Sequence, residues 1–133
     1  MPPPENNGMK NLVLEREKEK PSVLLNLETG VGSIEGECYD VGIMSVFEEI
    51  EHWLRDYATL GKPFTLLVNV SYYNTSASKC FADLFALIEK ININADKAWA
   101  VMIEITDQDN YEDDKEAWSD MVPEFSTAKF QIV

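Results

Sequence analysis

The chain has few of the residues that enzymes use for catalysis or metal binding. Its 133 residues include one histidine, His52, and two cysteines, Cys38 and Cys80. One imidazole cannot form a histidine metal cluster, and His52 falls on the polar side of a predicted helix, away from any nucleophile that it could activate. Two cysteines are too few for a disulfide framework, and we interpret both as buried thiols. These shortages argue against an enzyme.

Basic residues are also scarce. Eleven lysines and arginines stand against 24 aspartates and glutamates, which gives a formal net charge of −13. Such an acidic chain repels nucleic-acid phosphates and anionic lipid, so we expect neither as a partner, and a partner with a basic patch is favoured. No apolar run reaches membrane-spanning length, and the start of the chain, MPPPENNGMK, lacks the apolar core of a signal peptide. We therefore expect a cytoplasmic protein.

Motifs for metal and phosphate binding are missing too. The acidic segment DQDNYEDD invites a calcium-loop interpretation, but counting from Asp107 places Glu112 where an EF-hand needs glycine and Trp118 where it needs glutamate. The glycines are scattered and form no phosphate-binding loop. We expect no metal and no cofactor. The acidic residues 104–124 are interpreted as a solvated segment or a partner surface, in which Tyr111 and Trp118 either anchor a partner or dock a helix.

The hydrophobic pattern predicts an α/β fold. Apolar alternation favours strands, and apolar residues at spacings of three and four favour helices. The predicted strands cover 12–17, 22–27, 31–39, 64–73, 98–105 and 125–133, and the predicted helices cover about 43–57, 80–91 and 112–121. An antiparallel hairpin followed by alternating strands and helices predicts a mixed sheet of five to six strands with helices packed on it. We expect a disordered lead over residues 1–9 and one domain over 10–133.

Aromatic residues supply much of the predicted core. Trp53, Phe85 and Trp99 lie on apolar stripes and are expected to be buried. Strict alternation along 64–73 places Tyr72 on the apolar face of the strand. Of Tyr72 and Tyr73, we expect one to be buried and the other to border the junction that follows.

That junction, YYNTSASKC at residues 72–80, carries more helix-capping side chains than one helix needs. Asn74, Thr75, Ser76 and Ser78 could each cap a helix. Ligands of α/β proteins sit outside the carboxyl ends of strands, and helix N-termini stabilise anions. A phosphate could bind here, or be attached to Thr75 or Ser76. Alternatively, Asn74 or Thr75 caps the helix and the other hydroxyls are incidental.

The same junction resembles the motif of the SiaC family of bacterial regulatory phosphoproteins, which usually runs tyrosine, aromatic, Asn-Thr-Ser-Ser-Ser-Lys. The hairpin LNLETGVGSIEGECY, the aromatic-rich first helix and the acidic C-terminal segment are also similar, so the resemblance covers about residues 10–133. The chain departs from the pattern at Ala77, where serine is common. The resemblance implies a STAS-like fold, similar to anti-sigma-factor antagonists.

The resemblance also implies a function, that of a non-enzymatic switch. The acceptor by position would be Thr75, phosphorylated by a GHKL-type kinase and dephosphorylated by a PP2C-type phosphatase. The unmodified protein would bind and control a partner, in the best-known system a diguanylate cyclase of cyclic di-GMP signalling. The partner-binding surface would consist of Tyr73, Asn74, Thr75, Ser76, Ser78 and Lys79. The alternative is a STAS-like module that binds a small anion or nucleotide at the same helix start.

Overall fold

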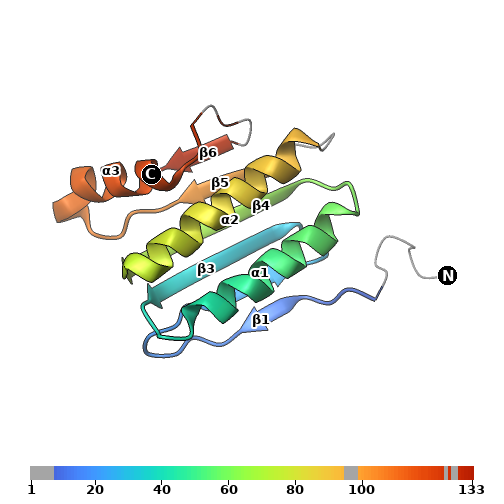
Figure 1. Cartoon of the computed structure of the whole chain (residues 1–133), viewed down its shortest axis with the longest axis horizontal. Coiled ribbons are helices and arrows are strands. Elements are labelled where there is room, and N and C mark those ends of the chain that lie inside the picture. Colours follow the sequence, from blue (N-terminus) through green and yellow to red (C-terminus); the bar gives the residue numbers. More distant parts are fainter. Residues whose placement is uncertain (1–7, 95–98, 125, 127–128) are drawn as a thin grey trace.

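A computed structural model describes residues 8–94, 99–124, 126 and 129–133. Within these residues the elements follow one another in the predicted order (Figure 1). They are β1 (Leu12–Leu14), β2 (Ser22–Asn26), β3 (Val31–Cys38), α1 (Ile43–Ala58), β4 (Phe64–Tyr73), α2 (Thr75–Ile93), β5 (Trp99–Ile103), the 3₁₀ helix η2 (Gln108–Asn110), α3 (Tyr111–Met121) and β6 (Lys129–Ile132). Most of the predicted lead, residues 1–7, lies outside the described residues, while Met9 is partly buried against the core.

The strands form one six-stranded sheet in the order β1-β2-β3-β4-β5-β6. The pairs β1–β2 and β2–β3 are antiparallel, and the pairs β3–β4, β4–β5 and β5–β6 are parallel. The predicted mixed α/β sheet, with its N-terminal hairpin and later crossovers, is therefore confirmed. The likeness to STAS domains stays a prediction.

The hairpin between β2 and β3 depends on a glycine. Gly30 has a φ of 69°, in the left-handed region that side chains with a Cβ rarely adopt. A Cβ at Gly30 would also lie 2.8 Å from the carbonyl oxygen of Pro63 and 2.9 Å from the hydroxyl of Tyr57. The turn therefore packs closely against the segment that leads into β4.

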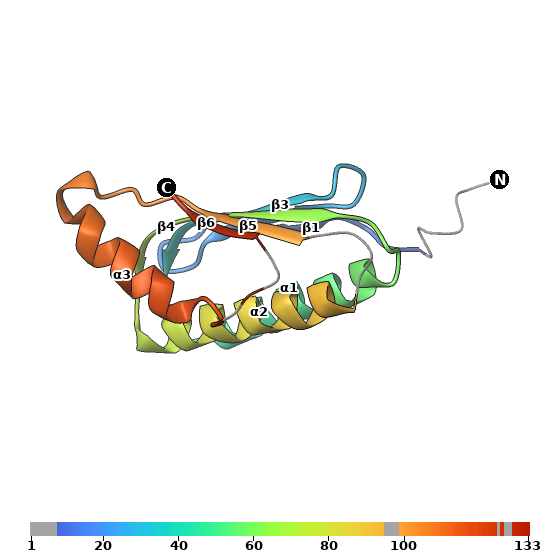
Figure 2. The ribbon, with the colours of Figure 1, turned by 90° about the horizontal axis from the view of Figure 1, so that it is seen from above.

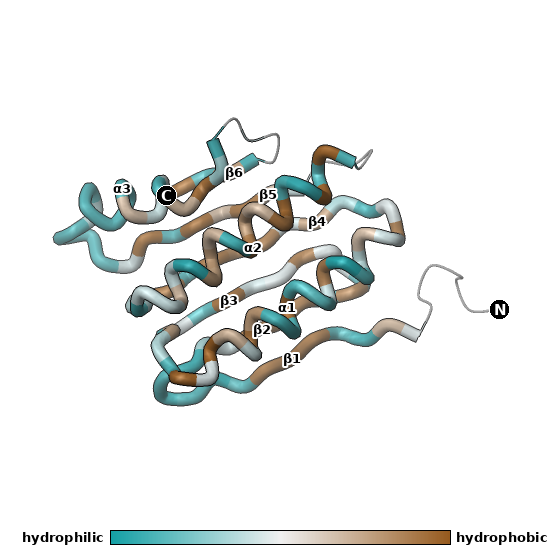
Figure 3. The backbone as a smooth tube through the Cα atoms, viewed as in Figure 1, coloured by the Kyte–Doolittle hydropathy of each residue, from teal (hydrophilic) through white to brown (hydrophobic). Residues whose placement is uncertain are grey.

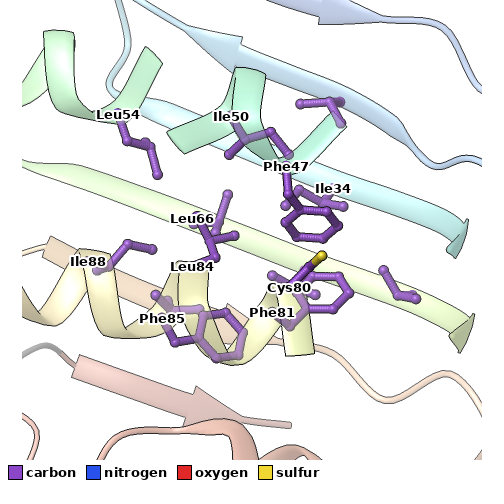
Figure 4. Close-up of a cluster of buried hydrophobic side chains, with 14 of the residues drawn as sticks. Ile34, Phe47, Ile50, Leu54, Leu66, Cys80, Phe81, Leu84, Phe85 and Ile88 are labelled. Atoms are coloured by element: carbon purple, nitrogen blue, oxygen red, sulfur yellow. The ribbon is translucent and has the colours of Figure 1, made fainter. Parts of the chain in front are cut away.

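Helices α1 and α2 lie side by side on one face of the sheet, and the other face is not covered by any described helix (Figure 2). The core fills the space between this helical layer and the sheet (Figure 4). The predicted stripe of α1 is buried throughout: Ile43, Val46, Phe47, Ile50, Trp53, Leu54 and Tyr57. Trp53, Phe85 and Trp99 are buried as predicted.

Two element boundaries differ from the prediction, while the start of α2 follows one of the predicted capping alternatives. Asn74 caps the helix, so α2 begins at Thr75 and the hydroxyl residues form its first turn, ahead of the predicted apolar stripe 80–91. Strand β1 ends at Leu14, where the charged residues 15–20 begin. The last predicted strand is shorter, since β6 begins at Lys129; of its earlier residues, 125, 127 and 128 lie outside the described residues.

A β-bulge at Ser71 changes which tyrosine faces the helices. Gly36 pairs with Val70, but Glu37 pairs with Tyr72, so Ser71 is an extra residue in β4. The bulge shifts the alternation by one residue beyond this point. Tyr72 is therefore 55% exposed, whereas Tyr73 packs at 5.0 Å from the ring of Trp118. The prediction that Tyr72 continues the apolar face was wrong because alternation alone does not reveal a bulge.

Helix α2 is less deeply buried along one edge than predicted. Leu87 and Ile91 are only half-buried. They line a groove between α1 and α2, together with Ala58 and Ala86. The small side chains on both helices leave this groove unfilled, which the broad apolar stripe did not indicate.

Candidate functional site

The start of α2 is fixed by Asn74, whose side chain and backbone both make hydrogen bonds. Its side-chain oxygen accepts a hydrogen bond from the backbone N–H of Ala77 at 2.9 Å. Its side-chain amide donates to the carbonyl of Tyr39 at 3.4 Å, and its backbone N–H donates to the carbonyl of Cys38 at 3.2 Å. Asn74 therefore caps α2 and ties it to the end of β3. Of the capping alternatives left open by the sequence, the structure selects Asn74.

Thr75 follows as the first residue of α2. Thr75, Ser76 and Lys79 are exposed, Ser78 is half-buried, and Ala77 is fully buried. The hydroxyls of Thr75 and Ser76 are accordingly accessible to another protein. The position where the family motif commonly has serine faces the interior in this chain, so its alanine removes no hydroxyl from the surface.

Thr75 lines a shallow surface groove of about 540 Å³ between the start of α2 and the last turn of α3. Helix α2 and the end of β4 contribute Tyr73, Asn74, Thr75, Ser78, Lys79 and Ala82. Helix α3 contributes Ala117, Asp120 and Met121. The structure thus brings together five of the six predicted partner-binding residues, and leaves Ser76 outside the groove.

The α3 residues of this groove were not identified from the sequence. They follow Thr75 by more than 40 positions in the chain, in a segment for which the sequence predicted a short helix but no contact with the start of α2. Helix α3 is largely hydrophilic, in contrast to the apolar strands β4 and β5 (Figure 3). Its one strongly buried aromatic residue, Trp118, is the signal that could have placed it against α2.

Trp118 docks α3 and is not available to a partner. The side chain is 3% exposed and its ring lies 5.0 Å from that of Phe81 in an edge-to-face arrangement. Tyr73 contacts Trp118 and Phe81 as well, at ring distances of 5.0 and 6.5 Å. Of the two interpretations of Trp118, the docked helix is confirmed. This aromatic cluster supports the floor of the groove.

The groove is surrounded by charges of opposite sign. Lys79 is one helical turn after Thr75, and no carboxylate within the described residues lies within 4.0 Å of its ammonium group. Asp120 lies on the α3 side. Burial raises the pKa of Tyr73, and the negative charge of Asp114 raises it further. The first N–H groups of α2 add a partial positive charge beside Thr75.

The groups considered for catalysis lie elsewhere or are inaccessible. The side chain of His52 is 81% exposed on α1 and lies 3.4 Å from Asp56, outside the groove. Cys38 and Cys80 are buried free thiols, as predicted. In the part of the chain that the structure describes, no three His, Cys, Asp or Glu side chains are placed to hold a metal ion, and no helix could cross a membrane.

Comparison with known proteins gives consistent matches. The family model described as "SiaC family regulatory phosphoprotein" matches residues 14–133. Among solved structures, apo-SiaC from Pseudomonas aeruginosa superposes with a TM-score of 0.79 at 21% sequence identity, covering 93% of this chain and 98% of that chain. A second structure of SiaC from Pseudomonas aeruginosa gives a TM-score of 0.79 at 20% identity, with coverages of 94% and 98%.

A third similar structure is a complex. It is the crystal structure of the diguanylate cyclase SiaD with its activator SiaC from Pseudomonas aeruginosa, which matches with a TM-score of 0.73 at 19% identity and covers 91% of this chain and 97% of that chain. No curated protein sequence matches this chain. At these identities the structural matches establish the fold.

Proposed function

Because this chain belongs to the SiaC family of regulatory phosphoproteins, we propose that it is a non-enzymatic switch protein controlled by reversible phosphorylation of Thr75. The observation that carries the proposal is the position of Thr75: an exposed hydroxyl on the first residue of α2, at the rim of a groove, with Lys79 one turn away. A phosphoryl group there would face the positive end of the helix and a nearby ammonium group.

Thr75 fits this role better than its neighbours. Ser76 is exposed but lies outside the groove, and Ser78 is half-buried. Thr75 combines exposure with a place in the groove. Its spacing from Lys79 is four residues, at which side chains on a helix meet. The folded protein would therefore tolerate a phosphoryl group on Thr75 without unfolding α2.

Phosphorylation would change the surface that a partner meets. A phosphoryl group adds about −1.5 to −2 charges and three acceptor oxygens. It would pair with Lys79 and face Asp120 across the groove, which changes both the shape and the charge of this surface. The unmodified protein then binds its partner, and the modified protein releases it. Tyr73, Asn74, Ser76, Ser78 and Lys79 form the partner-binding surface with Thr75.

The proposed partners follow from the family. A GHKL-type kinase transfers the γ-phosphoryl group of ATP to the Thr75 oxygen, which loses its proton as ADP leaves. A PP2C-type phosphatase hydrolyses the phosphoester, which restores the hydroxyl and releases inorganic phosphate. The output partner would be a diguanylate cyclase, since SiaC of Pseudomonas aeruginosa activates the cyclase SiaD with which it crystallised. The use of ATP would place the switch in the cytoplasm.

The direct test is intact-mass analysis with peptide mapping of protein purified from native cells in the presence of phosphatase inhibitors. We expect one phosphoryl group, on Thr75. Thr75→Ala should abolish the modification and leave partner binding constitutive, whereas Thr75→Asp should weaken binding. Ser76→Ala is the matched control for the modification alone, which it should leave intact. An unmodified Thr75 under all growth conditions, or a Thr75→Ala variant with wild-type phosphorylation, would contradict the proposal.

One observation favours a second function at the same place. Lys79 and the start of α2 could bind a small anion or nucleotide without covalent change. Phosphate or nucleotide that co-purifies with the protein and is lost on dialysis, with Thr75 unmodified, would favour this alternative.

A further inference from the structure

The face of the sheet opposite α1 and α2 carries a row of six residues, four of which are large and apolar. Strand register places one residue of each strand in this row, because neighbouring strands pair them directly. From β1 to β6 the row reads Val13, Leu24, Ser33, Leu67, Met102 and Gln131. The described helices lie on the other face of the sheet (Figure 2). Because these residues alternate with the buried or partly buried ones along their strands, their side chains are on the uncovered face. We call these six residues the open-face row.

Four members of the open-face row are large, apolar and exposed. The exposed fractions are 57% for Val13, 44% for Leu24, 37% for Leu67 and 37% for Met102. Scattered exposed apolar side chains are normal on a monomer, but here they form two neighbouring pairs, Val13 with Leu24 and Leu67 with Met102, in one line across the sheet. Ser33 lies between Leu24 and Leu67 and is the smallest member of the row, so a single large side chain of a partner would fit over it.

Charges lie on one side of this row. The next row on this face, toward the end of the sheet that leads to Thr75, contains Glu35, Asn69 and Glu104. Both glutamates are exposed, and Asn69 donates a hydrogen bond to Glu104 at 3.0 Å. The next row on the opposite side of the open-face row is uncharged except for one lysine at the edge of the sheet. It consists of Asn26, Val31, Thr65, Ala100 and, at the edge, Lys129.

We propose that the open-face row is the docking surface for an amphipathic helix of a partner protein, with lysine or arginine along one side of its apolar ridge. The ridge would lie along Val13, Leu24, Leu67 and Met102, and the basic side would face Glu35 and Glu104. Five strands at about 4.8 Å separation span about 19 Å, which a helix of about 13 residues covers. The net charge of −13 disfavours both a second copy of the chain and an anionic membrane as occupant.

This surface is separate from the phosphorylation site. Thr75 lies on α2, in the helical layer, whereas the open-face row lies on the opposite face of the sheet. The two can therefore be occupied together, and the second interface does not depend on the proposed switch. Thr75→Asp should leave binding at the open-face row unchanged, even where it weakens binding at Thr75.

The probe is a synthetic amphipathic peptide of about 14 residues, with leucines at helical spacing and lysines along one side of the leucine ridge. Its affinity is measured by fluorescence anisotropy, and its site by backbone amide shifts in NMR spectra. We expect shifts on the open-face row and loss of affinity by about tenfold or more in the double variant Leu67→Ser, Met102→Ser. The matched control is Met44→Ser, Ile93→Ser, which changes two exposed apolar residues on the helices.

Two charge-reversal variants distinguish the effect of a local charge at the open-face row from the effect of the net charge. Glu35→Lys and Glu49→Lys change the net charge equally, but Glu49 is exposed on α1. We expect only Glu35→Lys to weaken binding of the lysine peptide and to improve binding of an otherwise identical peptide with glutamate in place of lysine.

Three results would overturn the proposal. The first is equal binding of a peptide of the same composition in scrambled order. The second is equal loss from Glu35→Lys and Glu49→Lys. The third is that the protein sediments as a dimer and that the double variant Leu67→Ser, Met102→Ser is a monomer. The face would then be a contact between copies of this chain. If circular dichroism shows that the double variant is unfolded, Leu24→Ser replaces it with the same expected loss of binding.

Discussion

At the residue scale, Asn74 is the side chain on which the geometry of the site depends. Its side-chain oxygen caps α2 by accepting from the N–H of Ala77, and its two N–H donors join the helix start to the carbonyls of Cys38 and Tyr39 at the end of β3. Loss of an N-cap side chain costs about 1 kcal/mol, because the N–H that it satisfied loses its partner. This residue therefore contributes both to stability and to the orientation of Thr75.

We predict that Asn74→Ala lowers the free energy of unfolding by about 1 to 2 kcal/mol. Asn74→Asp should cost less, because its carboxylate keeps the acceptor for the N–H of Ala77 and interacts favourably with the start of the helix. Urea unfolding followed by circular dichroism measures both. Equal losses in the two variants would show that the bond to the carbonyl of Tyr39, which only the amide can make, matters more than the cap.

The burial of Cys38 affects how the stability of the protein depends on pH. The pKa of its thiol is raised from 9.0 to about 12, mainly by burial and in addition by the neighbouring Cys80. Between these two pH values the native state holds a proton that the unfolded state has released. Stability is therefore kept below pH 9 and is lost as the pH rises toward 12, at up to about 1.4 kcal/mol per pH unit.

We predict that the free energy of unfolding falls less steeply above pH 9 in Cys38→Ala than in the wild-type protein. The readout is the difference between the two slopes, so the cost of the substitution itself cancels. Burial also raises the pKa values of Tyr57 and Tyr73, and these groups remain in both proteins. Identical slopes would show that the Cys38 thiol is not protected by burial.

At the scale of elements, α3 is held by two buried side chains, Trp118 and Met121. Trp118 contacts Tyr73, Phe81 and Phe85 at ring distances of 5.0, 5.0 and 6.4 Å. The remainder of α3 is mostly exposed and acidic. Because α3 forms one side of the groove at Thr75, its docking determines the shape of the candidate site.

We predict that Trp118→Ala costs about 3 to 5 kcal/mol and loosens α3 before the rest of the protein unfolds. Hydrogen exchange should show lost protection across Tyr111–Met121, while β4 stays protected. Tyr111→Ala, at the half-buried start of the same helix, is the control and should have a smaller effect. Uniform loss of protection in all elements would show that α3 belongs to the same cooperative unit as the sheet.

The sequence predicted some helices and strands well and others poorly. The stripe Ile43–Tyr57 predicted α1 because seven apolar residues share one helical face, and all seven are buried. The alternation over Phe64–Tyr73 predicted the bounds of β4. The bulge at Ser71 could not be predicted, since an extra residue in a strand keeps the same residue types and changes only the pairing partner.

The candidate site was predicted in part. The capping residues located the start of α2, and the family motif pointed to Thr75. The contribution of Ala117, Asp120 and Met121 depends on how α3 returns to the sheet, which is a property of the tertiary structure. The half-buried Leu87 and Ile91 show the same limit, because helical periodicity does not tell how closely α1 and α2 approach.

At the scale of the whole molecule, the net charge affects the stability of the fold. With a formal charge of −13, the folded chain is destabilised by repulsion between its own carboxylates. The ion pairs among the described residues are partly exposed, and such pairs contribute little. Screening by salt should therefore remove more repulsion than attraction.

We predict that the midpoint of urea unfolding at pH 7 rises as sodium chloride is increased from low to physiological ionic strength, at which the screening length is about 8 Å. Potassium chloride should give the same result, because the effect depends on ionic strength and not on a bound cation. A midpoint that falls with salt would instead show that the surface ion pairs outweigh the repulsion.

The strand order has a consequence for how the protein is made. Positions along the sheet follow positions along the chain, so no later strand inserts between two earlier ones. A chain leaving the ribosome can therefore add each strand to one growing edge of the sheet. The proposed acceptor Thr75 emerges well before α3, so its groove is incomplete until α3 has followed. Recognition of the finished groove thus requires a chain in which α3 has already been made and docked.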